Sequence, residues 1–266
     1  MKLKEFIPSL THTIQLVSKS AKQLRQPKNV VPVIVSLTTI PYRLNKVHIT
    51  IRSILNQSTA PEKIILWLHE DLKNAIPKSL KKLEGSCFSI QFSSISCPHL
   101  KLVETLAKHS DCIIVTCDDD MIYPNNWLET IYNTHKANPK KVITNFSREI
   151  SYKQDGSIKP YKNWPYNKGD ESDKLLPLGV GGVLYPPHAL HKDATNTKLF
   201  LTLCPKADDL WFKAMALINN TETYRLQTSI PLIPVMFTQK VSLKKQNIGK
   251  DFNVEQWKNL SQHFNL

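Results

Sequence analysis

The sequence predicts an α/β fold, a mostly parallel sheet with helices on both of its faces, and two observations support this prediction. From residue 30 onward, short runs of β-branched and aliphatic residues alternate with longer stretches in which apolar residues recur every three or four positions. Short connections join these runs, as is typical of doubly wound parallel sheets. Such sheets bind ligands at the carboxyl ends of their strands, so polar residues directly after a strand are the first candidates for a functional site.

The expected elements follow one another in a regular order. Strands are expected at 31–38, 62–69, 88–94, 111–117 and 141–146, and helices at 44–57, 99–109 and 124–137. The strands are rich in Val, Ile and other residues that favour a pleated, buried chain. In the helices the apolar residues share one face, and Pro124 is placed to open the last of them.

The alternation ends at residue 147. Residues 147–177 are polar and lack periodicity, so we expect an irregular excursion there. A glycine-rich turn with a short strand is expected over 178–187 and a helix over 208–219, followed by a basic tail, 238–266, without a strong period. The predicted organisation is therefore an N-terminal helix, residues 1–29, and one α/β domain, residues 30–266.

The composition indicates an anionic partner, because the chain of 266 residues carries a formal net charge of +13. Its 41% hydrophobic residues suffice for a core, but no apolar run is long enough for a membrane span. No signal-peptide pattern is present, and the five cysteines, an odd number without close pairs, are expected to be reduced and buried. We therefore expect a soluble cytoplasmic protein.

Residues 1–29 predict a basic amphipathic helix. Residues 1–30 hold six basic side chains and one acidic one, Glu5, and their apolar residues recur at helical spacing. These apolar residues are Phe6, Leu10, Ile14, Val17, Ala21 and Leu24. Pro8 fits the helix only near its start, because an interior proline removes a main-chain hydrogen bond. Two interpretations stay open: the helix packs on the domain with its lysines in water, or it lies on the anionic inner face of the cytoplasmic membrane.

Three consecutive aspartates, Asp118, Asp119 and Asp120, follow the strand expected at 111–117. In an extended chain Asp118 and Asp120 point to one side and Asp119 to the other. Two carboxylates that converge on one site repel each other unless a cation compensates, so the motif predicts a divalent ion, Mn²⁺ or Mg²⁺. The alternative is a cluster that caps the following helix.

Five motifs occur in the order found in a known family. They are VSLTTIPYR (35–43), PEKIILWL (61–68), IIVTCDDDMIYPNNWL (113–128), GVGGVLYPP (179–187) and ADDLWFKAMAL (207–217). Over residues 30–260 the chain resembles the nucleotide-sugar-dependent glycosyltransferases of the GT-A fold, in particular bacterial family-2-like enzymes of capsule and lipopolysaccharide biosynthesis. The resemblance implies a Rossmann-like domain that transfers a sugar from a UDP-sugar to a hydroxyl of a surface polysaccharide or lipid-linked glycan, with inversion.

The resemblance also implies which residues bind the donor. Asp120 is expected to bind the metal directly and Asp118 to lie near the metal or the ribose, with Asp119 beside them. The nucleotide and its diphosphate are expected to contact Thr38, Thr39, Pro41, Arg43, His69 and Lys101. Read from the residues alone, Arg43 suits bidentate phosphate recognition, with a solvated side chain as the alternative.

The two later motifs are expected to serve the sugar and the acceptor. Gly181 and Gly182 would let the main chain approach the donor sugar or the acceptor, unless they form only a turn before the strand. Asp209, or else Asp208, would take the proton of the acceptor hydroxyl, a contribution of about 10²–10⁴ in rate. The alternative is a pair of carboxylates that favours the start of a helix.

The chain departs from the family pattern in two ways. The stretch before the aspartates lacks the glycines and arginines of many members, and no third metal ligand is assigned, with His188 and His263 as candidates. Within enzymes the rivals are a retaining glycosyltransferase and a sugar-nucleotide nucleotidyltransferase, although the latter usually has a glycine-rich loop that SLTTIPYR (36–43) lacks. A basic nucleic-acid- or membrane-binding protein is the non-enzymatic alternative, and we expect no nucleic acid, because three aspartates repel phosphates.

Overall fold

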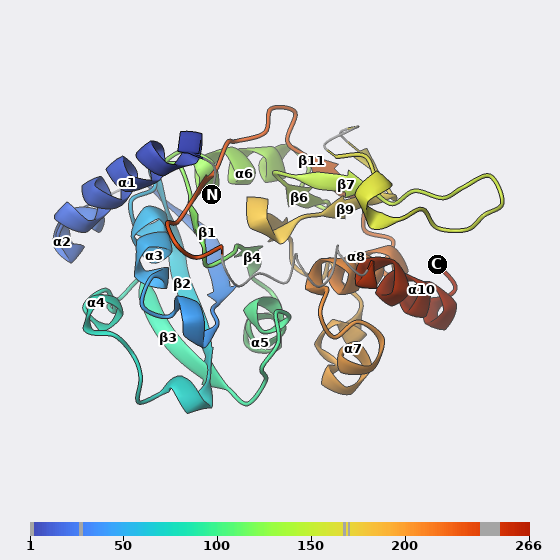
Figure 1. Ribbon diagram of the computed structural model, residues 1–266, viewed down its shortest axis with the longest axis horizontal. Helices are drawn as coiled ribbons and strands as arrows, with labels where there is room; N and C mark the ends of the chain where they lie inside the picture. The colour runs from blue at the N-terminus through green and yellow to red at the C-terminus, as the bar shows by residue number, and fades with distance from the viewer. Residues whose placement is uncertain (1–2, 27–28, 167–168, 170, 240–250) are drawn as a thin grey trace.

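In the computed structural model, which describes residues 3–26, 29–166, 169, 171–239 and 251–266, a sheet of eight strands runs through the protein (Figure 1). The strands, in their order across the sheet, are β3 (Phe88–Ser93), β2 (Thr59–His69), β1 (Asn29–Thr38), β4 (Ile113–Thr116), β10 (Val183–Tyr185), β6 (Val142–Thr144), β11 (Thr223–Arg225) and β8 (Glu171–Ser172). β10 and β8 are antiparallel to their neighbours and the other pairs are parallel. The predicted mostly parallel sheet is confirmed.

Helices cover both faces of the sheet because both faces of its central strands are apolar. The core on one face contains residues of α3 (Val47–Leu55), α4 (Lys78–Lys81) and α6 (Trp127–Ala137). The core on the other face contains residues of α5 (Leu100–Lys108), α7 (Thr197–Leu203), α8 (Asp208–Ile218) and α10 (Phe252–Phe264). In β1, Val35 belongs to the first core, whereas Ser36 faces α5 and contacts the hydroxyl of Thr105 at 2.7 Å. The predicted helices on both faces are thereby confirmed.

Two small sheets lie outside the large one. β5 (Met121–Ile122) pairs with β12 (Ile233–Pro234), and β7 (Ser147–Glu149) pairs with β9 (Leu175–Pro177). The stretch 147–177, expected to be irregular, therefore contains strands and two buried aromatic residues, Tyr161 and Trp164. Strands of two or three residues are too short to show a period, which is why the pattern missed them.

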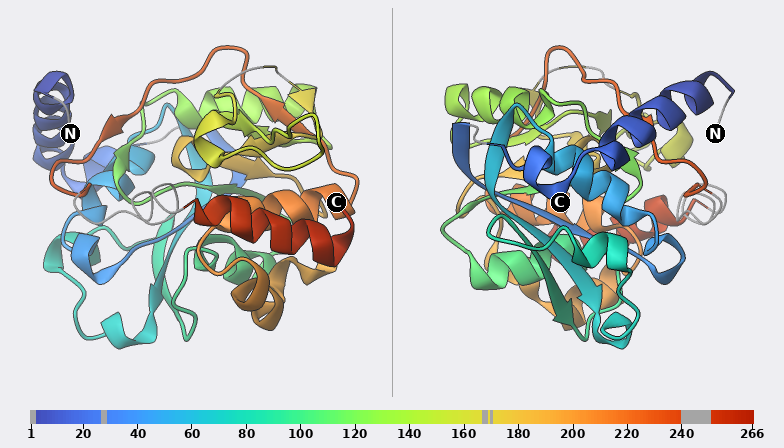
Figure 2. Two further views of the ribbon diagram at one scale, coloured as in Figure 1. Left: turned by 45° about the vertical axis from the view of Figure 1, so that its right-hand side comes forward. Right: turned by 90° about the vertical axis from the view of Figure 1, so that its left-hand side faces the viewer.

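The N-terminal segment is helical, as predicted, and forms α1 (Leu3–Ser18) and α2 (Ala21–Leu24). Figure 2 shows α1 at the edge of the molecule, with its first turns projecting away from the body. Pro8 lies inside α1 rather than at its start, so that expectation was wrong; the helix loses one main-chain hydrogen bond there. Among the described residues, no helix is both long enough and apolar enough to span a membrane.

The C-terminal stretch was expected to lack a strong period, yet it includes the helix α10. Its buried side is built by Asn253, Gln256, Trp257 and Leu260, so two of the four buried positions are amides. An apolar period cannot reveal such a helix. Residues 240–250 of the predicted basic tail lie outside the described residues.

Candidate active site

A cavity of about 1300 Å³ opens at the carboxyl ends of the parallel strands. Thr38 at the end of β1, His69 at the end of β2 and the three aspartates after β4 line one side of it. Arg148 of β7 and Asp209 of α8 also line the cavity, and Asp209 lies near Asp118, since a β-carbon on Gly179 would lie 3.0 Å from Oδ1 of Asp209 and 3.4 Å from Oδ1 of Asp118. The topology explains this convergence, because parallel strands deliver their carboxyl ends to the same edge of a sheet.

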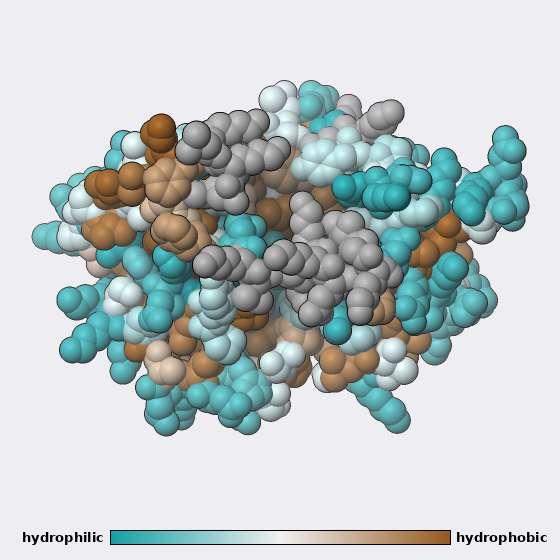
Figure 3. Space-filling view, viewed as in Figure 1, coloured by the Kyte–Doolittle hydropathy of each residue, from teal (hydrophilic) through white to brown (hydrophobic). Residues whose placement is uncertain are grey.

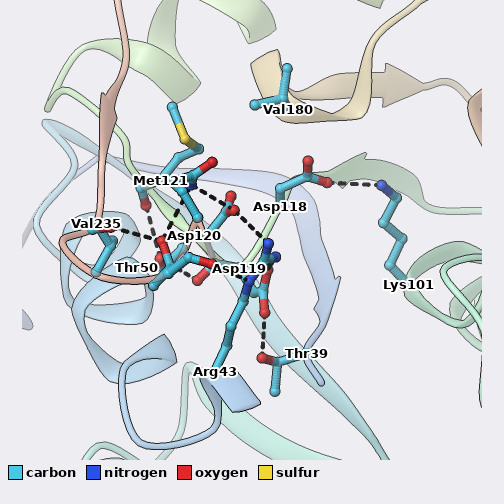
Figure 4. A network of polar contacts seen from close by, with 12 residues as sticks. Thr39, Arg43, Thr50, Lys101, Asp118, Asp119, Asp120, Met121, Val180 and Val235 are labelled. Atoms are coloured by element: carbon cyan, nitrogen blue, oxygen red, sulfur yellow. Dashed lines mark hydrogen bonds and ion pairs between the residues drawn. The ribbon is translucent and has the colours of Figure 1, made fainter. Parts of the chain in front are cut away.

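Arg43 holds two of the three aspartates together (Figure 4). Its Nη1 atom lies 2.6 Å from Oδ1 of Asp119 and its Nη2 atom 3.0 Å from Oδ2 of Asp120. The Thr39 hydroxyl donates a further hydrogen bond to Asp119. Two adjacent carboxylates can be buried here because a planar guanidinium binds both at once.

The side chains do not alternate as an extended chain would require. Asp119 and Asp120 share Arg43, whereas Asp118 turns toward Lys101 (Figure 4). The strand β4 ends at Thr116, and Asp119 and Asp120 lie in a turn, so the period of two no longer applies there. Asp118 and Asp120, predicted to point to one side, thus bond different cations, Lys101 and Arg43.

Lys101 connects this turn to the second acidic motif. Its Nζ atom lies 3.0 Å from Oδ1 of Asp118 and 2.8 Å from Oδ2 of Asp208. The lysine is 6% exposed, and although its burial lowers its pKa, the charges of Asp118 and Asp208 raise it further, so the amine stays protonated. In turn, burial raises the pKa of Asp208, but the charge of Lys101 outweighs this and keeps it below its ordinary value.

Asp209 has a different environment from its neighbour Asp208. The main-chain N–H of Gly179 donates a hydrogen bond of 3.0 Å to its Oδ1 atom. Burial and the charge of Asp208 raise the pKa of Asp209 to about 8, against the opposing effect of Lys101. Asp209 therefore binds a proton more readily than an ordinary carboxylate, and it lies on the cavity wall.

Asp120 also has a raised pKa. Burial and the charge of Asp118 raise it to about 7, although Arg43 acts in the opposite direction. Gln239 donates a hydrogen bond of 2.9 Å to Oδ2 of Asp120, and the N–H of Val235 donates one of 2.8 Å to its main-chain oxygen. The segment 233–239, which we call the strap, thus lies against the aspartate turn, and no sequence motif indicated it.

The remaining predicted nucleotide contacts occupy the same side of the cavity. Thr38, Thr39, Pro41 and His69 line it together with Arg43. The Thr38 hydroxyl donates to the main-chain oxygen of Trp67 at 2.9 Å, and Nδ1 of His69 lies 3.1 Å from Oδ2 of Asp71. The structure therefore brings together the residues of the first, second and third motifs.

The predicted glycines have another environment. Gly181 and Gly182 are not among the residues that line the cavity. A β-carbon on Gly181 would lie 2.7 Å from the ring of Phe146, and one on Gly182, whose φ is +91°, would lie 2.5 Å from the indole of Trp127. They allow a tight turn to pack on aromatic side chains. The glycine that contacts a site residue is Gly179, which the sequence analysis did not single out: its main-chain N–H bonds Asp209, and its neighbours Leu178 and Val180 line the cavity.

Neither candidate for a third metal ligand reaches the cavity. His188 is exposed, and its Nε2 atom lies 3.2 Å from Asp111. His263 lies in α10 and packs edge-on against Phe264. Within the described part of the chain, no group of three or more His, Cys, Asp or Glu side chains is arranged to hold a metal ion.

The aspartate pair nevertheless fits a divalent ion that takes its other ligands from water and phosphate. Among the described residues, Asp118 bonds through Oδ1 and Asp120 through Oδ2, which leaves one oxygen of each carboxylate for a further ligand. The charge of Asp118 raises the pKa of Asp120, so a nearby cation would favour the ionised form of both. Mg²⁺ is commonly held by one or two carboxylates together with substrate phosphates, and Mn²⁺ prefers the same oxygen ligands.

Comparison with known proteins shows no family. No protein-family model and no curated protein sequence matches the chain. Among solved structures, 4-diphosphocytidyl-2C-methyl-D-erythritol synthase from Anaerococcus prevotii aligns with 74% of this chain and 88% of its own, at 13% identity and a TM-score of 0.46. CMP:2-keto-3-deoxy-manno-octonic acid synthetase in complex with CTP aligns with 76% and 91%, at 11% identity and a TM-score of 0.41.

These similarities are too distant to carry a functional argument. The Rossmann-like α/β fold is shown by the sheet topology itself. Neither of the two structures is named as a glycosyltransferase. The glycosyltransferase family therefore remains a prediction.

Proposed function

We propose that the protein is a metal-dependent glycosyltransferase that moves a sugar from a nucleotide sugar to the hydroxyl of a glycan. The single observation behind this proposal is that two acidic motifs, the aspartates 118–120 and Asp209, line one cavity, with Lys101 between Asp118 and Asp208. A transferase needs one site for the donor diphosphate and another for the proton of the acceptor. The two motifs supply one each.

The donor side would bind the nucleotide. Thr38, Thr39, Pro41 and His69 form a wall for the nucleoside, and Asp118 and Asp120 would hold a Mn²⁺ or Mg²⁺ ion. Such an ion, when bound with the donor, offsets the charge that develops on the departing nucleoside diphosphate. Arg43 keeps Asp119 and Asp120 in place, which is the role that its two short ion pairs support.

The acceptor side would remove a proton. Asp208 is held by the Lys101 ammonium, so its charge is already compensated. Asp209 has one main-chain donor, Gly179, and a pKa raised to about 8, which makes it the stronger base of the two. We therefore assign proton removal from the acceptor hydroxyl to Asp209. Attack from the side opposite the leaving group would invert the anomeric carbon.

The finer identity of the substrates follows the family resemblance. A UDP-sugar is the proposed donor, and a surface polysaccharide or a lipid-linked glycan the proposed acceptor. The rival is a nucleotidyltransferase that makes the sugar nucleotide. The two similar structures are named as a synthase of a diphosphocytidyl compound and a synthetase of a CMP-linked acid, which fits this rival. The turn after β1 has no glycine from Thr38 to Leu44, which speaks against the phosphate loop that such enzymes usually have.

One screen separates the two activities. Purified protein with Mn²⁺ is incubated with a panel of UDP-, GDP- and CMP-sugars, and release of the free nucleotide is measured. In parallel it is incubated with CTP or UTP and sugar phosphates, and release of pyrophosphate is measured. The proposal predicts nucleotide release with one donor class, loss of it with chelator, and loss of it in Asp120→Ala. Pyrophosphate release without nucleotide-sugar turnover would establish the rival.

A further inference from the structure

The helix α1 packs on the domain with its less apolar side. Ser9 is fully buried, its hydroxyl bonds the main-chain oxygen of Pro234 at 2.7 Å, and Leu16 is the buried apolar residue of the contact. The apolar stripe of the helix faces solvent instead. Its members, with their exposed fractions, are Ile7 (66%), Leu10 (38%), Ile14 (59%) and Val17 (46%).

This orientation is the reverse of what a helix packed on its own domain requires. The spacing of 7, 10, 14 and 17 places the four side chains in one row along the helix. Figure 3 shows apolar residues gathered on this part of the surface, over α1. Burying an aliphatic side chain is worth about 1.5–3 kcal/mol, so an exposed row of four indicates a partner that covers it.

More apolar residues are exposed close to the strap. Phe237 is 58% exposed, Tyr42 47% and Ile40 40%, and the Tyr42 hydroxyl bonds the main-chain oxygen of Phe237 at 3.3 Å. The strap also contacts α1, because Pro234 accepts the bond from Ser9 and Val235 shares a small core with Leu16. The strap thus connects α1 with the segments that carry these three side chains.

The charge around this surface is positive. Lys22 is exposed in α2, and Nζ of Lys46 lies 5.0 Å from the centre of the Phe237 ring. Among the described side chains of residues 5–26, Lys19, Lys22 and Arg25 are basic and Glu5 is acidic. A second copy of this chain would bring the same positive charge against it, whereas an anionic lipid surface is complementary in both charge and polarity.

We infer that the α1 row, with Phe237, Tyr42 and Ile40 beside it, docks the protein on an anionic lipid bilayer. The apolar side chains would enter the boundary between headgroups and acyl chains, and the lysines would contact lipid phosphates. Glu5, on the packed side of the same helix, lines the cavity, so the cavity lies next to the docked helix. If the proposed function holds, this position presents the cavity to acceptors anchored in that bilayer.

The test measures binding of the full chain to vesicles without nucleotide or acceptor. Sedimentation with phosphatidylcholine vesicles, with and without phosphatidylglycerol, should show binding only with the anionic lipid, and binding should weaken as salt is raised. Ile14→Glu should reduce the partition coefficient about tenfold or more. Its matched control is Leu201→Glu, an apolar residue with 46% exposure on α7, which should bind as the wild type does.

A second pair of variants tests the charge. Lys22→Glu should weaken binding about fivefold, whereas Lys198→Glu on α7 should have little effect. Circular dichroism and thermal melting verify that each variant is folded. Equal binding of Ile14→Glu and Leu201→Glu, or no binding of the wild type to anionic vesicles, would refute the inference. So would concentration-dependent dimerisation that Ile14→Glu abolishes, since a second copy would then cover the row. None of these outcomes depends on whether the enzyme transfers sugars.

Discussion

Gly179 leaves no room for a side chain beside Lys101, because a β-carbon there would lie 2.6 Å from the lysine Nζ atom. The same β-carbon would lie 3.0 Å from Oδ1 of Asp209 and 3.4 Å from Oδ1 of Asp118. Three ionisable groups of the candidate site therefore meet above one glycine. The absence of a side chain there is a condition for their arrangement.

Gly179→Ala should accordingly impair the site more than the fold. The methyl group displaces the Lys101 amine or the Asp209 carboxylate, and we expect kcat/KM for transfer to fall at least about tenfold, the effect of losing roughly 1.4 kcal/mol of stabilisation. The control is Gly156→Ala, where a β-carbon meets no atom within 4 Å but φ is +79°. That variant should lose stability by about 1 kcal/mol and keep its activity. Equal activity of the two variants would contradict the prediction.

Replacing the two neighbouring acids should have different effects. Asp209→Asn should lower kcat by about 10²–10⁴, with the dissociation constant for nucleotide and Mn²⁺ within a few-fold of wild type, because the amide cannot accept the hydroxyl proton. Asp208→Asn should instead lower stability by about 2 kcal/mol, because the buried Lys101 loses one of its two carboxylates. Single-turnover kinetics, nucleotide titration and urea unfolding distinguish the two. Normal transfer by Asp209→Asn would make the assignment of the base wrong.

Arg43→Lys should destabilise the protein despite conserving the charge. A lysine cannot contact Asp119 and Asp120 with two separate donors, so one buried carboxylate loses a charge-assisted hydrogen bond worth about 1.5–3 kcal/mol. Mn²⁺ with UDP should recover part of this loss, because the ion compensates the same carboxylates. The measurement is the melting temperature of both proteins with chelator and with Mn²⁺ and UDP. An Arg52→Lys variant serves as the control, because the Arg52 guanidinium bonds the main-chain oxygens of Leu16 and Lys19.

The two raised carboxyl pKa values predict how stability depends on pH. Folded Asp120 and Asp209 hold protons up to about pH 7 and 8, whereas the unfolded chain releases them near the ordinary value of 3.8. Their contribution is therefore complete at low pH and is lost as pH rises through these values. Three buried bases have lowered pKa values: His48 and His99 about 4 instead of 6.5, and Lys213 about 8 instead of 10.5. The histidines change stability mainly below about pH 6.5 and the lysine mainly above about pH 8, so neither dominates between these two values.

Between about pH 6.5 and 8, in chelator, the free energy of unfolding should thus decrease with rising pH, by at most about 1.4 kcal/mol per pH unit for each carboxyl. Asp209→Asn should reduce the slope, and Mn²⁺ should flatten it, since the ion binds the ionised form. Urea unfolding at several pH values measures it. A stability that rises across this interval in wild type, or an unchanged slope in Asp209→Asn, would contradict the pKa assignments.

The long, uniformly apolar elements of the fold could be read from the sequence, and the short or amide-lined ones could not. β1 and β2 have consecutive buried residues that only a doubly covered strand explains, and both were predicted. β5 and β12 have two residues each, too few for a period. α10 was missed because Asn253 and Gln256 occupy buried positions that the pattern expects to be apolar.

The candidate site was predictable where topology alone decides proximity. Residues that follow parallel strands reach the same edge, so Thr39, Arg43 and the aspartates 118–120 could be expected together. Gln239 could not, because it is 119 residues from Asp120 and reaches it through the strap. Gly179 was passed over in favour of Gly181 and Gly182 because the sequence does not show which glycine of the turn faces charged groups.

The strap connects the first helix with the candidate site. Ser9 bonds Pro234, and Val235 and Gln239 bond Asp120, so a few main-chain units connect α1 with the aspartate assigned to the metal. An enzyme shortened to begin at β1 for easier purification would release one end of this connection. The strap would then hold Asp120 less firmly, and kinetic constants measured on the shortened protein would differ from those of the full chain. Tags or deletions at the N-terminus should therefore be avoided when activity is measured.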